Sequence, residues 1–314
     1  MRTFTTRSFE QMRERGQSLA SLWASQAAIY QRYGYAQASV LRTYSIDTVD
    51  IRLLRSPPEQ LEVVRESATE AFDTLKEVYR QFAADRFGCL HRAKVLWQAN
   101  ALAEVEADGP VHAAIVRDGD NPMGYMVYTL RGGRVDHVAR GQEIIVRDTA
   151  WLSADAYRAL WAFIARHDLV GRVVSRNLPA DDPSPELLAE PRLLRARDEE
   201  GSWFRIIDVE TALAARGYSA PGTLVIDVPE DDLAPWNAGR FELSVDDEGS
   251  AAVRRVSSDA DLTVPVKALA SAFTGARPVR ALGAWGLIQG TPAAIARADA
   301  MFATRFAPHT PDHF

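Results

Sequence analysis

The first stretch of the chain spaces its apolar positions as an α-helix does. Residues 1–15 predict such a helix, and Gly16 supplies its end. Its apolar face consists of Met1, Phe4, Phe9 and Met12. No N-cap residue stands ahead of the first apolar position. Two explanations stay open: an N-terminal helix that frays, or coding sequence that is missing upstream of Met1.

The next apolar run has the length of a strand, and a short helix follows it. Residues 18–25 (SLASLWAS) predict a strand that ends at Ser25, and residues 26–35 (QAAIYQRYGY) predict one short helix that Gly34 ends. The inner face of this helix is predicted to consist of Ala28, Ile29, Arg32 and Tyr33. An extended run begins at Tyr35.

Residues 51–197 predict a second unit in which strands and helices alternate. Residues 111–135 predict a hairpin, and residues 141–174 predict a strand, a helix with Ser153 as its N-cap, and another strand. This order indicates a second α/β layer. Because it contains no glycine-rich phosphate loop, we expect it to be catalytically inert.

Three further stretches complete the organisation. Residues 52–82 predict helix after a proline-marked start, and the proline-rich residues 177–194 predict a linker. Residues 198–314 predict strands followed by helices, the last of them capped by Thr291, which is typical of an α+β domain.

Composition narrows the class of protein. The 314 residues are 47% hydrophobic and 25% charged, with a net charge of −6, which gives a nucleic-acid partner no electrostatic support. No run reaches the length of a membrane span. The single cysteine, Cys89, excludes an internal disulfide and favours a cytoplasmic location. No metal site is expected, because the histidines that could be ligands lack ligand spacing: His112, His137 and His167.

The short helix carries the candidate chemistry. Residues 28–35 (AIYQRYGY) contain the Φ-Y-x-x-x-G-Y/F part of the pattern A-x-x-Φ-Y-x-x-x-G-Y/F, and their setting after a helix and a strand resembles the second half of a GNAT acetyltransferase. A phenol within reach of a leaving thiolate can act as a general acid, and the resemblance gives this role to Tyr30. Ser25 either contacts the pantetheine of acetyl-CoA or caps the helix. Tyr33 and Tyr35 are expected to be packing residues.

The whole chain resembles the enhanced intracellular survival (Eis) acetyltransferases, which join two GNAT-like domains to a sterol-carrier-protein-like domain. The resemblance rests on ASQAAIYQRYGYAQA, AWLSADAYRALWAFIARHDLV, WFRIIDVETALAARGY, PWNAGRF, ADLTVPVKALASAFTGARP and ADAMFATRFAPHTPDHF. It implies the remnant of a first GNAT domain over residues 1–50, a second, non-catalytic GNAT-like domain over 51–197, and a sterol-carrier-protein-like α+β domain over 198–314.

The resemblance also implies an activity and its residues. It implies acetyl transfer from acetyl-CoA to a primary amine, of the aminoglycoside, polyamine or lysine type, by a homo-oligomer without a metal. Tyr30 would be the general acid, and the carboxylate of Phe314 the base. The alternatives are that Tyr30 is a core residue and that Phe314 ends a frayed tail.

The sequence departs from the family at two places. His313, beside Asp312, stands where relatives are expected to carry an acidic residue, which puts the acceptor in doubt. The Arg-rich, Gly-containing loop that would hold the CoA pyrophosphate ahead of the first helix has no counterpart, so we expect this chain to bind acetyl-CoA weakly. A non-catalytic binding or scaffold protein is the alternative function. Lipid carriage by the last domain is less favoured.

Overall fold

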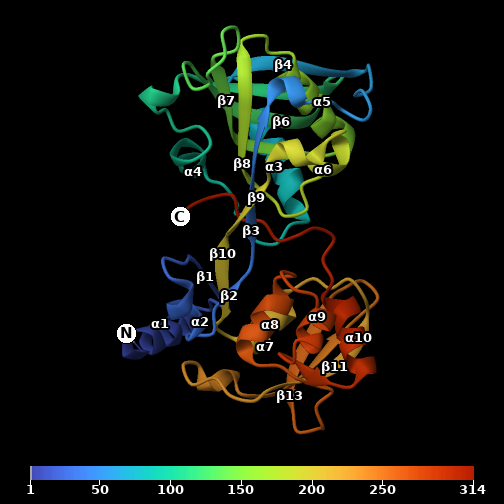
Figure 1. Cartoon of the computed structure of the whole chain (residues 1–314). Helices are drawn as coiled ribbons and strands as arrows, with labels where there is room; N and C mark the ends of the chain where they lie inside the picture. The colour runs from blue at the N-terminus through green and yellow to red at the C-terminus, as the bar shows by residue number, and fades with distance from the viewer. Residues whose placement is uncertain (1) are drawn as a thin grey trace. The chain divides into compact units, whose positions relative to one another are not determined.

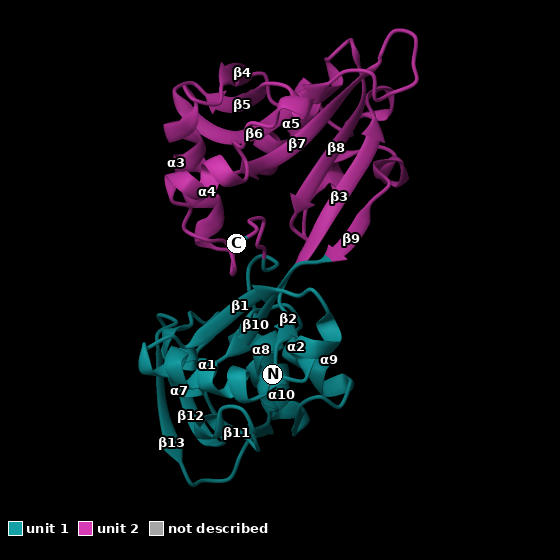
Figure 2. Cartoon of the chain, turned by 90° about the vertical axis from the view of Figure 1, so that its left-hand side faces the viewer, with its two compact units in different colours: residues 1–39, 200–308, 314 teal, residues 40–199, 309–313 magenta. Residues whose placement is uncertain are grey.

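The structure, a computed structural model, describes residues 2–314 and divides them into two compact units (Figure 2). Met1, which the sequence put on the apolar face of the first helix, lies outside the described residues. Unit 1 comprises residues 1–39, 200–308 and 314, and unit 2 comprises residues 40–199 and 309–313. Segments that are far apart in the sequence therefore share a unit.

Unit 2 is built, within the described residues, on a seven-stranded sheet in the order β4-β5-β6-β7-β8-β3-β9. β7 and β8 pair in parallel, whereas the neighbouring pairs β4–β5, β5–β6, β6–β7 and β3–β8 are antiparallel. The strands are β3 (Val40–Asp47), β4 (Leu61–Ser67), β5 (Val111–Asp118), β6 (Asn121–Arg131), β7 (Gln142–Trp151), β8 (Val170–Leu178) and β9 (Arg197–Glu200). The helices are α3 (Phe72–Ala84), α4 (Lys94–Ala99), α5 (Ala154–Ala165) and α6 (Ser184–Leu187).

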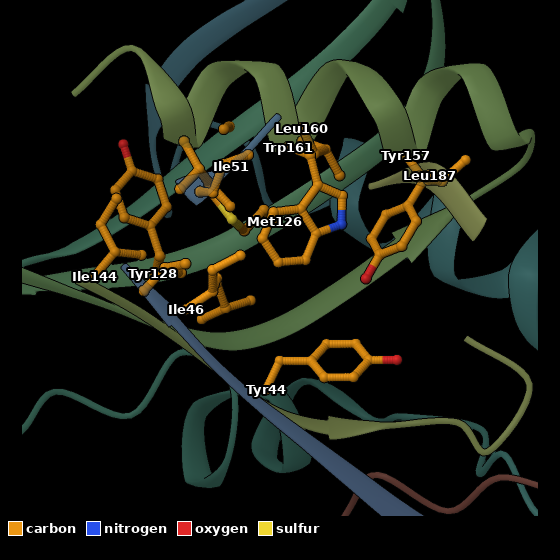
Figure 3. Packing of buried hydrophobic residues seen from close by; sticks show 14 of the residues in the cluster. Tyr44, Ile46, Ile51, Met126, Tyr128, Ile144, Tyr157, Leu160, Trp161 and Leu187 are labelled. Carbon is orange, nitrogen blue, oxygen red and sulfur yellow. The ribbon is translucent and has the colours of Figure 1, made fainter. Parts of the chain in front are cut away.

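Helices cover both faces of this sheet, because its strands are apolar on both faces. Met126 and Tyr128 of β6 pack with α5, and the alternate residues Tyr125 and Val127 pack with α3 and Trp97 of α4. Figure 3 shows the first of these cores, in which side chains of α5 point toward side chains of the strands.

Unit 1 contains two sheets. The first is antiparallel, in the order β1-β10-β2, so that a strand from residue 202 onward lies between two strands from the first forty residues (Figure 1). The second has the order β13-β12-β11-β14-β15. The strands are β1 (Leu19–Trp23), β2 (Ala36–Gln37), β10 (Ser202–Ile206), β11 (Gly222–Val228), β12 (Gly239–Val245), β13 (Ala251–Val256), β14 (Leu262–Thr263) and β15 (Gln289–Gly290).

The helices of unit 1 pack against these two sheets. α8 lies against β10 and β2, α7 against β13, and α10 against β11. The helices are α1 (Arg2–Glu14), α2 (Ala27–Gln31), α7 (Val209–Ala215), α8 (Val266–Phe273), α9 (Val279–Ala284) and α10 (Pro292–Phe302).

The α/β plus α+β fold class is confirmed, and so are several local predictions. The hairpin of β5 and β6 turns between Asp118 and Asn121, and the hydroxyls of Ser153 and Thr291 accept the capping hydrogen bonds of α5 and α10. The three-domain division and the inert second GNAT-like domain stay predictions.

Three local predictions were wrong. Residues 61–67 form β4 rather than helix, because pairing with β5 decides their conformation. The segment predicted as a linker is structured: it forms α6 and a 3-10 helix (Pro191–Leu194). Ser184 and Leu194 of these helices are fully buried in unit 2. Phe4 is 77% exposed, so the predicted apolar face of α1 is only partly covered.

Candidate active site

The predicted acid lies on a short helix that follows the end of β1. β1 ends at Trp23 and α2 begins at Ala27, so only three residues join them. The predicted inner face of this segment was right for Tyr33 and wrong for Ala28 and Arg32, which are exposed. Ala27, Tyr30 and Tyr33 pack against the core of unit 1, whereas Ala28 is exposed. Because α2 has only five residues, its tertiary contacts rather than its own periodicity select the inner side.

Tyr30 is half-buried in this core, with its ring edge against Tyr35 at a centroid distance of 5.9 Å. Burial raises the pKa of Tyr35 to about 12, so Tyr35 stays neutral at physiological pH and acts as a packing residue, as predicted. Within residues 2–314, no side-chain hydrogen bond involves the hydroxyl of Tyr30, and this hydroxyl is not one of the buried polar groups that lack a partner. The phenol is therefore open to solvent or to a ligand.

The turn after Tyr30 has a backbone shape that requires glycine. Gly34 has φ +78°, and the backbone N–H of Tyr35 returns to the carbonyl oxygen of Tyr30 at 3.2 Å. A Cβ on Gly34 would lie 2.9 Å from Nε of Arg205 and 3.2 Å from Val266. The glycine of the motif thus serves both the turn and the close approach of an arginine.

Arg205, on β10, holds this turn in place and is fully buried. Its Nε donates to the carbonyl oxygen of Tyr33 at 2.9 Å, and its Nη2 contacts both carboxylate oxygens of Asp231, at 2.6 and 2.5 Å. Its guanidinium also lies 5.1 Å from the ring centroid of Phe9 on α1. Sequence reasoning missed Arg205 and Asp231. The sequence signals the pair only weakly. Arg205 is a charged residue inside the apolar run WFRIID, and Asp231 stands shortly before PWNAGRF.

Ser25 lies between β1 and α2 and is exposed. The N-cap of α2 is Gln26, and no side-chain bond caps the helix. The alternative that Ser25 caps this helix was therefore wrong. Its role toward pantetheine stays a prediction.

Phe314, the last residue, belongs to unit 1 and packs beside Trp23 of β1. The two ring centroids are 6.4 Å apart, and Phe314 is 57% exposed. Side chains alternate along a strand, so Trp23 points away from the face of β1 that Ala20 and Leu22 turn toward the core with Tyr30. Tyr30 and Phe314 therefore lie by opposite faces of the end of β1.

Neither a metal site nor a membrane-spanning helix is found within residues 2–314. Across residues 2–314, no group of three or more His, Cys, Asp or Glu side chains is arranged to hold a metal ion. In the same part of the chain, every helix is too short or too polar to cross a bilayer.

Family models match three stretches of the chain. An acetyltransferase (GNAT) domain matches residues 88–206, another acetyltransferase (GNAT) domain matches residues 1–38, and a sterol carrier protein domain matches residues 209–311. The second of these stretches contains β1 and α2, with Tyr30.

The sequence relatives are named as N-acetyltransferases. An N-acetyltransferase of Streptomyces coelicolor is 34% identical over 98% of this chain and 75% of its own length. The N-acetyltransferase Eis of Mycobacterium tuberculosis is 30% identical over 92% of this chain and 70% of its own length.

Solved structures agree with the sequence relatives. Eis1 of Mycobacterium abscessus is similar with a TM-score of 0.79 and 33% identity, over 99% of this chain and 77% of that one. A GCN5-related N-acetyltransferase of Anabaena variabilis gives a TM-score of 0.85 at 27% identity, over 100% of this chain and 77% of that one. GNAT acetyltransferases use acetyl-CoA as their co-substrate. The chain belongs to the Eis-like GNAT N-acetyltransferases with a C-terminal sterol-carrier-protein-like domain.

Proposed function

We propose that this protein transfers the acetyl group of acetyl-CoA to a primary amine of the aminoglycoside, polyamine or lysine type. The observation that carries the proposal is the half-buried phenol of Tyr30, whose hydroxyl has no hydrogen-bond partner among residues 2–314, a short distance along the chain from Trp23. A phenol whose ring is held by packing and whose hydroxyl is bonded to no other described residue can donate to a reacting group.

Each proton of the reaction has a residue assigned to it. Bound acetyl-CoA supplies the acetyl group as a thioester. The neutral amine forms a bond to the carbonyl carbon, the carbon–sulfur bond breaks, and the sulfur leaves as a thiolate. Tyr30 Oη donates a proton to that sulfur, and the carboxylate of Phe314 accepts the proton that the amine nitrogen loses. Exposed Ser25 supplies a hydroxyl and a backbone N–H to the pantetheine arm.

In this proposal, the acetyl donor and the acceptor amine approach from different faces of β1. The thioester approaches on the side of Tyr30 and α1, and the amine approaches on the side of Trp23 and Phe314. Two substrates that meet across the end of one strand gain the rate advantage of a fixed orientation. A homo-oligomer in the cytoplasm, without a nucleic-acid or membrane partner, is part of the same proposal.

The test is Tyr30→Phe in the full product of the gene, with Tyr33→Phe, in the turn that follows the same helix, as the matched control. The change removes only the hydroxyl, so packing against Tyr35 is kept. General-acid catalysis contributes about 100- to 10,000-fold to a rate, so kcat is expected to fall by that factor while the KM for acetyl-CoA stays within about twofold. Steady-state kinetics measure both. An unchanged kcat in Tyr30→Phe would make Tyr30 a core residue and overturn its assignment as the acid.

A further inference from the structure

The last residues before Phe314 are buried in a way that chain ends seldom are. His309, Thr310 and Asp312 are 3%, 1% and 1% exposed, and they belong to unit 2. Terminal residues are usually poorly ordered unless specific contacts hold them. Something in unit 2 is therefore built to bind this peptide, which we call the tail segment (residues 309–312).

A buried arginine receives the carboxylate of the tail segment. Nε of Arg92 donates to Asp312 Oδ2 at 2.8 Å, and both atoms lie in side chains that are at most 2% exposed. The two terminal nitrogens of Arg92 donate to the two oxygens of Asp148, at 2.7 and 3.1 Å. Tyr125 adds a hydrogen bond to Asp148 at 2.6 Å. One guanidinium thus holds two carboxylates with different nitrogens.

The half of this cluster that does not involve the tail segment is complete by itself. Arg92 and Asp148 form a neutral, bidentate pair, and the guanidinium lies 3.9 Å from the ring centroid of Tyr79 and 4.6 Å from that of Trp97. These rings and Asp148 fix the plane of the guanidinium. Its Nε is then left pointing at the position that Asp312 fills.

The loop before Arg92 also fits the backbone of the tail segment. The N–H of His309 donates to the carbonyl oxygen of Phe87 at 2.8 Å. A Cβ on Gly88, which has φ +89°, would lie 2.7 Å from Thr310 Oγ1 and 3.0 Å from the carbonyl oxygen of His309. Gly88 is thus needed for the close approach of the tail segment as well as for its own backbone conformation.

The sheet explains why a peptide finds room here. The parallel pairing of β7 with β8 ends at Val146 and Ser175, while β7 continues to Trp151. Asp148 lies two residues past the last paired residue of β7. Crevices where parallel strands part are places where α/β folds bind ligands.

We propose that Gly88, Arg92 and Asp148 form a binding site for the tail segment, and that Arg92 is a positioning residue for the terminal carboxylate. Two residues reach at most about 7 Å, so fixing Asp312 confines the carboxylate of Phe314 to a small volume. Such confinement raises the effective concentration of a reacting group. The positioning role rests on the proposed function, whereas the binding of the tail segment does not.

The test compares Asp312→Asn with Asp198→Asn in the full product of the gene. Asp312→Asn removes the charge of the tail but leaves the Arg92–Asp148 pair intact, so unit 2 keeps its fold. Asp198→Asn is the matched control, because Asp198 is bonded to Arg42 of unit 2 and does not contact the tail segment. Asp312→Glu serves as the conservative rescue. Carboxypeptidase Y digestion followed by mass spectrometry reports release of the tail segment, and steady-state kinetics report turnover.

We expect carboxypeptidase to remove Phe314 and His313 about tenfold faster or more from Asp312→Asn, since a charge-assisted hydrogen bond is lost. The control should be trimmed at the wild-type rate, and Asp312→Glu should be slower than Asp312→Asn. We also expect kcat to fall with an unchanged KM for acetyl-CoA. Wild-type trimming of Asp312→Asn would overturn the binding site whatever the activity. Faster trimming with wild-type kcat would keep the binding site and overturn the positioning role.

Discussion

Unit 1 and unit 2 each contain a buried arginine that binds a carboxylate, and the two arginines have different roles. Arg205 of unit 1 is bound to one carboxylate, that of Asp231, and to the backbone of the turn after Tyr30. Arg92 of unit 2 is bound to Asp148 and also to Asp312, near the end of the chain. Each is a buried charge that depends on its carboxylate partners, because a buried charge without a partner is costly.

The difference lies in what each arginine loses when one partner leaves. Without Asp231, Arg205 would be a buried cation with no counter-ion. Without Asp312, Arg92 keeps Asp148. Burial lowers the pKa of Arg92, but Asp148 together with Tyr125 and Tyr79 more than offsets this and holds the pKa above the ordinary value of arginine. Arg205 therefore holds a permanent contact. Arg92 holds a contact that can be broken while the rest of the unit stays folded.

The largest expected effect is a loss of kcat when the carboxylate of Phe314 is removed. A C-terminal affinity tag turns this carboxylate into an amide that carries no charge and accepts no proton at neutral pH. We expect kcat to fall at least about 100-fold in the full gene product, the lower end for acid–base catalysis, while an N-terminal tag leaves it unchanged. Kinetics and melting temperatures of the two tagged forms measure this. Equal kcat values would return Phe314 to the status of a passive chain end.

The second effect contrasts the two arginines directly. Asp231→Ala should lower the free energy of unfolding by about 3–5 kcal/mol, because it leaves Arg205 buried and unpaired. Asp312→Ala should lower it by only about 1–2 kcal/mol, because Arg92 retains Asp148. Urea unfolding monitored by tryptophan fluorescence measures both. Equal losses would contradict the distinction between a permanent and a breakable contact.

The third effect tests the close approach of Arg205 to the motif. Gly34→Ala adds a Cβ against Arg205 at a positive φ and should cost about 2–4 kcal/mol of unfolding free energy. Gly16→Ala is the control, since Gly16 has φ +73° but no atom within 4 Å of its added Cβ, and should cost about 1 kcal/mol. A cost at Gly34 no greater than at Gly16 would show that Arg205 does not require the glycine.

The smallest expected effect is a pH dependence of the binding of the tail segment (residues 309–312) to unit 2. Burial and the charges of Arg86 and Arg92 lower the pKa of His309 to about 3, so the docked tail keeps His309 neutral. A released histidine takes up a proton below pH 6.5, so docking weakens as pH falls from 6.5 toward 3. Between pH 7.5 and 5.5 the loss is about 1.4 kcal/mol, a tenfold rise in the released fraction.

Carboxypeptidase trimming at the two pH values, with rates corrected for the enzyme's own pH dependence, measures this release. Burial raises the pKa of Asp312, which acts in the opposite direction, so the comparison is made with His309→Gln, in which the contribution of Asp312 is unchanged. A variant that shows the same pH dependence as the wild type would remove His309 from the explanation.

The candidate site was predictable in part from its residues. The tyrosine–glycine stretch after β1 was visible because Gly34 and the phenols stand close together in the sequence. The side of α2 that faces the core was not, since Tyr30 faces the core on account of Trp203 and Tyr35 rather than of its spacing. Arg205 and Arg92 could not be singled out among many arginines, because burial is what gives each of them its role.

The sequence by itself determined the features that depend on residues close together in the chain. Alternation and caps determined the β5–β6 hairpin, the helices that Ser153 and Thr291 begin, and the fold class, because these depend on neighbours within a few residues. The tertiary structure alone decided that β10 lies between β1 and β2, that Phe314 packs on Trp23, and that Arg92 binds Asp312 across 220 residues of sequence. Such contacts depend on which surfaces the folded chain buries together, and no spacing along the chain records them.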